Sequence, residues 1–328
     1  MKFKKYLLLL LLGFLISSII FLSVVYFQVG SPTESSRWIY EARKIKLKIA
    51  DSIDKPKLIV VSGSNGLFGI SCQMIQEETE FPCINGSMIV ALQIDYMLDF
   101  ARSLSSEGDI VLLVLEYGTY KYNGQVNSVL VDYVFAREPD YIASQNLIRK
   151  IRLFGGLSLD RIAQGIIAKF KPPMKSKYGY QSNSINDYGD ETNNREANMT
   201  EYHYQTIASE KPIKSLLEGS DTTSKISMNI IKKFVDWCRQ NNIKVLATWP
   251  NTIYFEEYAQ PQTEKYLQSI KDFYQSIDVP ILGQPRDFMY DRSLFFDSVY
   301  HPHDRGTSIR TQKLIELLQP YLDKPTNF

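Results

Sequence analysis

An apolar run covers residues 6–27 of this 328-residue chain, broken only by Gly13 and three serines, and it contains no charged residue. At about 1.5 Å per residue, a helix of this length covers roughly 30 Å, the thickness of the hydrocarbon core of a bilayer. Three lysines precede the run, and basic residues gather on the cytosolic side of membrane spans. We therefore expect residues 1–30 to form a short cytosolic tip and a transmembrane helix, with the body of the chain outside the cytosol.

A cleaved signal peptide is the alternative explanation of this run. The apolar region of a signal peptide is usually about 7 to 15 residues long and ends in a small-x-small cleavage site. Here the run is longer, and the first alanine of the chain is Ala42. Both features favour an uncleaved signal anchor that crosses the cell membrane once.

The charges of the chain nearly cancel, with 37 Lys and Arg against 36 Asp and Glu, and no basic block stands out. Nucleic-acid binding, which requires the neutralisation of many phosphates, is therefore not expected. The cysteines Cys72, Cys83 and Cys238 are too few for a disulfide framework and match no zinc spacing, so we expect neither a metal nor another cofactor. Either Cys72 and Cys83 pair in an oxidising compartment, or all three are small buried residues.

The rest of the chain has the pattern of an α/β protein. Residues 31–56 contain an amphipathic stretch and are expected to form a stalk, and residues 57–328 the extracytoplasmic domain. Short runs of Val, Ile and Leu without alternation are typical of parallel strands that are buried on both faces. Such a sheet carries its site at the carboxyl ends of the strands. The predicted strands are 58–61, 110–115 and 245–248, and the predicted helices between them include 88–104 and 226–240.

Residues 171–223 depart from this alternation, because they are rich in Asn, Ser, Tyr, Asp and Lys and poor in aliphatic residues. Loops of this length are usually functional or disordered. The segment is predicted to be an insertion, which is either a surface loop without chemistry or a lid or acceptor-binding segment.

Residues that can carry chemistry stand at both ends of this domain. Ser64 follows the first predicted strand in a turn of small residues, where a serine is well placed as a nucleophile. Near the C-terminus, Asp297 precedes His301 by four residues and a helical pattern follows, so the pair can supply a general base and its orienting carboxylate. Glu116 and Asn251 also end strands. Glu116 is expected either to orient the site or to be a structural carboxylate, and Asn251 to line the pocket.

These segments resemble the SGNH or GDSL hydrolase superfamily, above all its membrane-anchored members that accompany membrane-bound O-acyltransferases in teichoic-acid D-alanylation and alginate O-acetylation. The resemblance covers residues 57–120 and 242–318. The residues that carry it are Gly63-Ser64-Asn65, Phe68-Gly69-Ile70, Ile84-Asn85-Gly86-Ser87, Gly108-Asp109-Ile110, Leu115-Glu116-Tyr117 and the segment from Asp297 to Thr311.

The resemblance implies a flavodoxin-like three-layer α/β/α sandwich of the SGNH type. It also implies that His301 is the general base, that Asp297 orients it, and that Asn85 and Gly86 lie near the block that lends an amide to the oxyanion hole. Two alignments of the nucleophile remain. Ser64 takes the position if Ser62-Gly63-Ser64 matches the family's Gly-Asp-Ser, whereas Asn65 takes it if Gly63-Ser64-Asn65 does.

The family's Gly-x-Asn-Asp has no match after the third strand, and the spacing from Asp297 to His301 is one residue longer than usual. Two functions are therefore expected from the resemblance. The first is transfer or removal of an acyl group, acetyl above all, on a cell-surface or exported polysaccharide, with a multi-span membrane-bound O-acyltransferase as partner. The second is a non-catalytic glycan-binding or scaffold subunit of such a complex. A plain esterase or lipase is a third and less favoured function.

Overall fold

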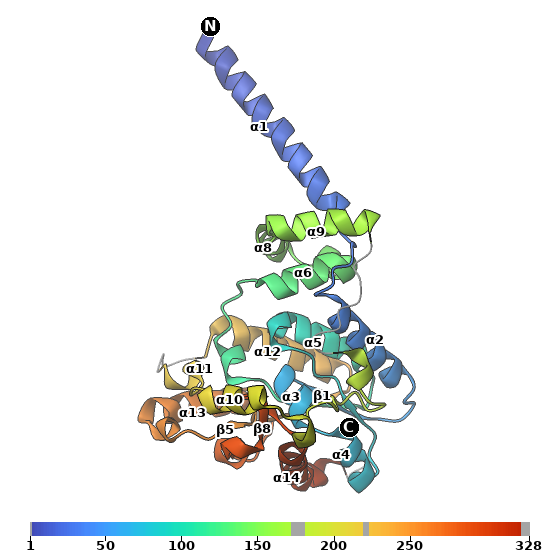
Figure 1. Ribbon diagram of the computed structural model, residues 1–328, viewed down its shortest axis with the longest axis vertical. Helices are drawn as coiled ribbons and strands as arrows, with labels where there is room; N and C mark the ends of the chain where they lie inside the picture. The colour runs from blue at the N-terminus through green and yellow to red at the C-terminus, as the bar shows by residue number, and fades with distance from the viewer. Residues whose placement is uncertain (1, 172–180, 219–222, 323–328) are drawn as a thin grey trace. The chain divides into compact units, whose positions relative to one another are not determined.

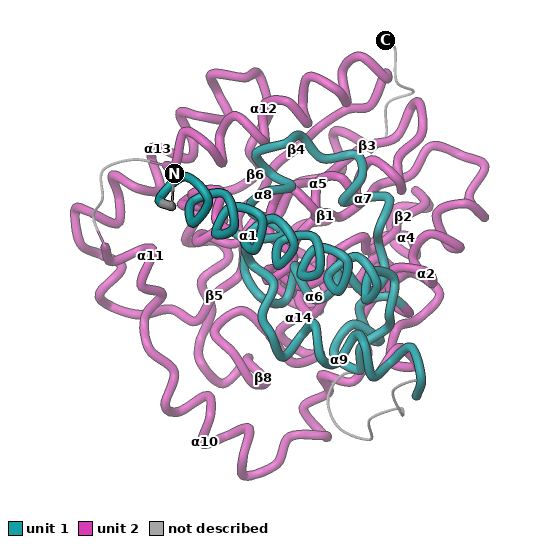
Figure 2. Tube along the Cα trace, turned by 90° about the horizontal axis from the view of Figure 1, so that it is seen from above, with its two compact units in different colours: residues 1–40, 126–179 teal, residues 41–125, 180–328 magenta. Residues whose placement is uncertain are grey.

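The computed structural model describes residues 2–171, 181–218 and 223–322, which form two compact units. Unit 1 contains residues 1–40 and 126–179, and unit 2 contains residues 41–125 and 180–328 (Figures 1 and 2). The helix α2, Arg37–Asp51, begins in the first and ends in the second.

Unit 2 is built on a five-stranded parallel sheet with the order β2-β1-β3-β4-β6. The three strands predicted from aliphatic runs are present, and their residues are almost all buried because helices cover both faces. Two shorter strands, β2 and β6, form the edges of the sheet and were not predicted from the sequence. The bounds are β1 Leu58–Val61, β2 Cys83–Asn85, β3 Ile110–Leu113, β4 Lys244–Thr248 and β6 Ile281–Leu282.

Helices pack on both faces of this sheet. Leu58, Val60 and Leu112 belong to a buried cluster with α4 and α14, whereas α5 and α12 contact β1 and β4 (Figure 1). The predicted helix 226–240 is present as α12, and the predicted helix 88–104 as a short 3-10 turn followed by α5. The bounds are α3 Ser64–Gly69, α4 Cys72–Thr79, η1 Val90–Leu92, α5 Gln93–Leu104, α12 Lys225–Gln240, α13 Pro261–Ser276 and α14 Asp304–Leu322.

Two small strand pairs lie beyond the sheet. Strands β5, Thr252–Ile253, and β7, Met289–Tyr290, pair in parallel, whereas β8, Phe295–Ser298, and β9, His301–Pro302, form an antiparallel hairpin. The remaining helices of unit 2 are η2 Tyr117–Lys121, η3 Ser182–Ser184, η4 Glu196–Asn198, α10 Glu201–Ser209, α11 Lys214–Leu217, η5 Glu256–Ala259, η6 Pro285–Phe288 and η7 Arg292–Leu294.

The predicted insertion, residues 171–223, is only partly an exposed loop. Residues 172–180 and 219–222 lie outside the described residues, but Asp190, Glu191 and Asn194 are buried. The Asn194 amide donates to the carbonyls of Phe68 at 3.1 Å and Pro302 at 2.7 Å. This part of the insertion therefore packs into unit 2 and joins α3 to β9.

Cys72 and Cys83 form a disulfide with a Cα–Cα distance of 5.1 Å, and Cys238 is free and buried. Of the two predicted alternatives the pairing is correct, and the reading of three buried thiols is wrong. The bond links the first residue of α4 to the first residue of β2.

Unit 1 is helical. It contains α1 Lys2–Phe27, α6 Ser128–Arg137, α7 Pro139–Ser144, α8 Leu147–Gly155 and α9 Leu159–Phe170. Residues 3–27 of α1 are long and apolar enough to cross a membrane, with a mean hydropathy of 2.8. Asp132 of α6 holds this unit together, because it accepts a hydrogen bond from Thr33 and pairs with the buried Arg161 of α9 at 2.7 Å.

Candidate active site

The predicted base and its carboxylate meet in the β8–β9 hairpin. His301 Nδ1 lies 2.7 Å from Asp297 Oδ1, and the two side chains are 14% and 23% exposed. The hairpin returns the chain after Ser298, which pairs with His301, and so brings residues four apart into contact. With Nδ1 donating to the carboxylate, Nε2 is the ring nitrogen that can accept a proton from a hydroxyl.

Ser64 begins α3, the short helix that packs against β9. The ring of Phe68 stacks on the ring of His301 with centroids 4.4 Å apart. Residues i and i+4 share one face of a helix, and helical side chains lean toward the N-terminus. Ser64 therefore lies on the face of α3 that meets His301, half-buried, although no hydrogen bond joins the two within the described part of the chain.

Asn65 points into the protein instead. Its Nδ2 donates to Asn251 O at 2.9 Å and to Asn251 Oδ1 at 3.1 Å, and its Oδ1 accepts from Arg310 Nη2 at 3.1 Å. All three residues are fully buried. Asn65 is thus a structural residue here, and Ser64 holds the accessible position in the turn.

Arg310 organises this buried network from α14. Its guanidinium also donates to the carbonyls of Asn65 at 3.1 Å and Trp249 at 3.3 Å, and burial lowers its pKa to about 10. Only a glycine fits at position 69, because an added Cβ would lie 2.4 Å from Asn251 Oδ1. The sequence analysis assigned no site role to Arg310. The sequence pattern that could have found it is an arginine four residues before Leu314, which places the arginine on the core-facing side of the last helix.

Glu116 holds the turn on both sides of Ser64. Its carboxylate accepts from the Gly63 amide at 3.2 Å and from the Asn65 amide at 3.1 Å. Burial raises the pKa of Glu116, against these hydrogen bonds and the nearby imidazole of His301, which lower it. A Cβ at Gly63 would lie 2.4 Å from Oε1, so the glycine permits this contact. Glu116 is therefore a hydrogen-bonded carboxylate that fixes the turn, and its predicted role in orienting the site stays a prediction.

Asn85 and Gly86 support α3 from below. The Asn85 amide donates to the carbonyls of Gly66 and Ile70, both at 3.0 Å, and to Asp190 Oδ1 at 3.1 Å. A Cβ at Gly86 would lie 2.7 Å from the side chain of Leu104. The donors of Asn85 are therefore already engaged within the fold, and the predicted oxyanion role of this pair stays a prediction.

A buried lysine lies beneath the same region. Lys46 Nζ of α2 donates to the carbonyls of Asn85 and Gly189, both at 2.5 Å. Burial lowers the pKa of Lys46 to about 7, although Asp190 and Glu191 act in the opposite direction. Burial also raises the pKa of Asp190, whose Oδ1 accepts a hydrogen bond from the backbone N–H of Cys72 at the start of α4.

Part of the insertion borders the Asp297–His301 pair. Helix α10 packs against β8, where the ring of His203 lies 4.4 Å from that of Phe296. Arg292 donates to the Glu210 carbonyl and lies over the ring of Phe255. The described part of the insertion thus covers the strand that carries Asp297. Whether it acts as a lid stays a prediction.

The arrangement brings an imidazole and a carboxylate into contact, and it places a serine on the short helix that packs against them. These are the residue types that nucleophilic acyl chemistry uses. Among the described residues, no group of three or more His, Cys, Asp or Glu side chains is placed to hold a metal ion. No protein-family model matches the sequence, and no curated protein is significantly similar to it.

Proposed function

We propose that this protein is a membrane-anchored, extracytoplasmic SGNH-like enzyme that transfers or removes an acyl group, acetyl above all, on a cell-surface or exported polysaccharide. The observation that carries the proposal is the 2.7 Å contact between Asp297 and His301, with the imidazole stacked on the helix face that bears Ser64. Ser64 is the nucleophile, His301 the general base and Asp297 its orienting group.

The strand order supports an SGNH-like sandwich. Numbered along the sheet's own strands, β2-β1-β3-β4-β6 is the order 2-1-3-4-5 of flavodoxin-like folds, and helices cover both faces. In such sheets a ligand binds at the carboxyl ends of the strands where the order reverses, which is between β1 and β3. Ser64 follows β1 and Glu116 follows β3.

The reaction proceeds in two halves. Ser64 Oγ attacks the acyl carbonyl and passes its proton to His301 Nε2, and the tetrahedral intermediate collapses when the leaving oxygen takes that proton. A sugar hydroxyl then gives its proton to His301 and attacks the acyl-serine, which transfers the acyl group and restores Ser64. Water in place of the sugar gives hydrolysis. The amides of Gly63 and Asn65 are engaged by Glu116 and are not assigned to the oxyanion.

The extracytoplasmic location has two supports besides the lysines before α1. Helix α1 is long and apolar enough to span a bilayer, and the Cys72–Cys83 disulfide is typical of an oxidising compartment. A multi-span membrane-bound O-acyltransferase that delivers the acyl group is the proposed partner, on the resemblance alone.

Labelling with a serine-reactive fluorophosphonate tests the site on the full-length protein. Wild type should be labelled at Ser64, Ser64→Ala should lose the label, and His301→Ala should lose most of it because the base is gone. Ser308→Ala, which changes an exposed serine of α14, serves as the matched control and should be labelled like wild type. In cells, Ser64→Ala and His301→Ala should abolish glycan acylation. Full acylation with Ser64→Ala would refute the nucleophile assignment.

A non-catalytic glycan-binding or scaffold subunit is the second candidate. It is favoured by the capture of two amides beside Ser64 by Glu116, which leaves fewer donors for an oxyanion. In that case the protein would bind the glycan without being labelled, and Ser64→Ala would leave acylation in cells unchanged.

A further inference from the structure

Unit 1 carries an apolar surface that the proposed chemistry does not use. On α8, residues 147, 151 and 154 follow the i, i+4, i+7 spacing of one helix face, and Ile148 lies beside them. Their side chains are exposed, with Leu147 72% exposed. The opposite side of α8 is buried through Arg149 and Leu153.

Helix α9 repeats this pattern. Leu159, Ile167 and Phe170 share one side of the helix and are exposed, Phe170 to 79%. Arg161, Ile162 and Gly165 form the buried side. We call the exposed apolar residues of these two helices the α8–α9 face. Exposed apolar residues gathered on one side of a helix are unfavourable in water and can mark a site of contact with a protein or a membrane.

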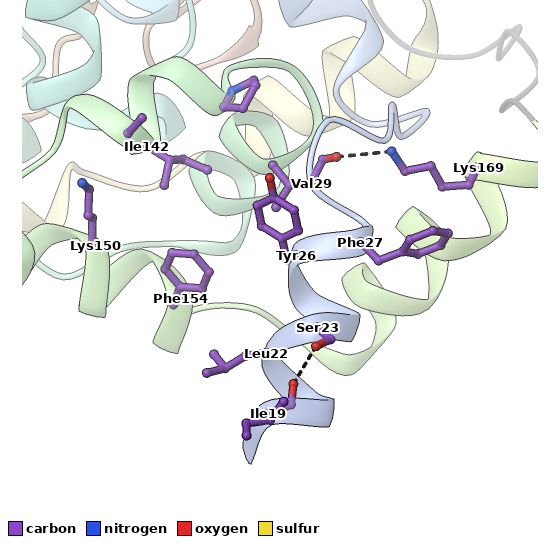
Figure 3. A pocket seen from close by; sticks show the side chains of 12 residues that line it. Ile19, Leu22, Ser23, Tyr26, Phe27, Val29, Ile142, Lys150, Phe154 and Lys169 are labelled. Carbon is purple, nitrogen blue, oxygen red and sulfur yellow. Dashed lines mark hydrogen bonds between the residues drawn. The ribbon is translucent and has the colours of Figure 1, made fainter. Parts of the chain in front are cut away.

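The α8–α9 face lies at the end of the apolar helix α1. Figure 3 shows a pocket of about 940 Å³ in which Leu22 and Tyr26 of α1 lie near Ile142 of α7 and Phe154 of α8. Helix α9 contacts α1 directly and runs across its C-terminal end (Figure 1). Because α1 ends at Phe27, the pocket lies where the span leaves the hydrocarbon core.

Charges and aromatic rings at this level suit a membrane interface. Lys150 and Lys169 line the pocket, and Lys169 Nζ lies 3.4 Å from the Val29 carbonyl and 5.9 Å from the centre of the Phe27 ring. Tyr26 is 81% exposed. Tyrosines near span ends occupy the headgroup layer, and lysines beside apolar stripes extend toward anionic headgroups.

We infer that the α8–α9 face is a lipid-binding surface that lies in the interfacial layer of the membrane crossed by α1, with acyl chains of that leaflet filling the pocket. The occupant is lipid because residues of α8 and α9 line one pocket with the exposed apolar helix α1, and because Lys150 and Lys169 stand at that pocket. The inference goes beyond the proposed enzymatic function and holds whether or not Ser64 is a nucleophile.

Depth-dependent fluorescence quenching tests this inference on the full-length protein in nanodiscs of phosphatidylethanolamine and phosphatidylglycerol. Single cysteines at Ile151→Cys and Phe170→Cys carry a bimane label, because Cys72 and Cys83 are paired and Cys238 is buried. Lipids with a spin label near the headgroup end of the acyl chain serve as quenchers. Both labels should lose about half or more of their intensity, as expected for side chains in the interfacial layer.

Gln164→Cys is the matched control, because Gln164 is exposed on the polar side of α9. Its label should be quenched far less. Ile16→Cys, in the middle of α1, reports the anchor separately. Quenching at position 16 alone would overturn the inference while leaving the span intact. Two other outcomes would also overturn the inference. One is that two copies associate and the labels at positions 151 and 170 are not quenched. The other is that a bound multi-span partner shields these labels from the lipid quenchers, because the face would then belong to a protein.

Discussion

At the scale of single residues, the shape of the candidate site depends on polar side chains that are buried. Arg310 connects the segments that follow β1 and β4 through Asn65, Asn251 and the Trp249 carbonyl, and Glu116 fixes the amides on either side of Ser64. A buried acceptor left without its donor costs the free energy of its desolvation. The position of the half-buried Ser64 is therefore determined by neighbouring residues that are buried within the fold.

Arg310→Met should lower the free energy of unfolding by about 3–5 kcal/mol, because it leaves several buried oxygens without donors. Urea unfolding of the protein in detergent, followed by tryptophan fluorescence, measures the loss. Arg305→Met is the control, since Arg305 is exposed on the same helix and should cost no more than about 0.5 kcal/mol. Equal midpoints for the two variants would show that the network adds nothing to stability.

Lys46 makes stability depend on pH. Its pKa is about 7 in the folded chain, against 10.5 for an ordinary lysine, so above pH 7 the unfolded chain binds a proton that the folded chain does not. Raising the pH makes this extra proton less available to the unfolded chain, so the free energy of unfolding rises with pH. Between about pH 7.5 and 9.5, the free energy of unfolding of wild type should rise by about 1 kcal/mol per pH unit relative to Lys46→Met.

Unfolding titrations at several pH values measure this difference. Lys48→Met, which changes an exposed lysine of the same helix, should follow the wild-type slope. Parallel curves for wild type and Lys46→Met would mean that Lys46 stays protonated throughout this range.

At the scale of elements, sequence reasoning succeeded where a pattern is local. Buried parallel strands are aliphatic runs, so β1, β3 and β4 were predicted nearly to the residue, and Asp297 and His301 meet because they share one hairpin. Strands β2 and β6 are too short to give a pattern. The partners of Asn85 and Arg310 lie far away in sequence, so only the folded chain reveals where their amide and guanidinium groups point.

The link between α4 and β2 can be measured directly. Replacing Cys72 and Cys83 together by serine should lower the free energy of unfolding by about 2–3 kcal/mol, because the bond closes a short loop in the unfolded chain. Treatment of wild type with a reductant under unfolding conditions should give the same loss. Cys238→Ala, which changes the free cysteine, is the control. Reduction should lower its free energy of unfolding by the same amount as that of wild type. A double variant as stable as wild type would contradict a stabilising role for the bond.

At the scale of the whole molecule, α1 and the α8–α9 face belong to one unit, and the candidate site belongs to the other. The sequence analysis recognised α1 by its length and hydropathy but did not predict α6–α9. Their residues follow helical periodicity with apolar side chains on exposed as well as buried sides, which obscures the single stripe that marks a soluble helix.

The proposed topology predicts the fate of the intact chain. A reporter enzyme that is active only outside the cytosol, fused after Phe328, should be active, and the protein should stay in the membrane fraction after an alkaline carbonate wash. The mass of the purified protein should include the residues of α1. A shorter, soluble product beginning after residue 30 would instead identify a cleaved signal sequence.

The hydrogen bonds of Glu116 have a consequence for how such a protein changes over generations. They hold Gly63 and Asn65, whereas the hydroxyl of Ser64 between them takes part in no hydrogen bond within the described residues. The turn therefore keeps its shape whatever small side chain stands at position 64. If Ser64 is the proposed nucleophile, a lineage can lose or regain the reactive hydroxyl by one substitution without refolding its neighbours, and a catalyst and a pure binder then lie a single mutational step apart.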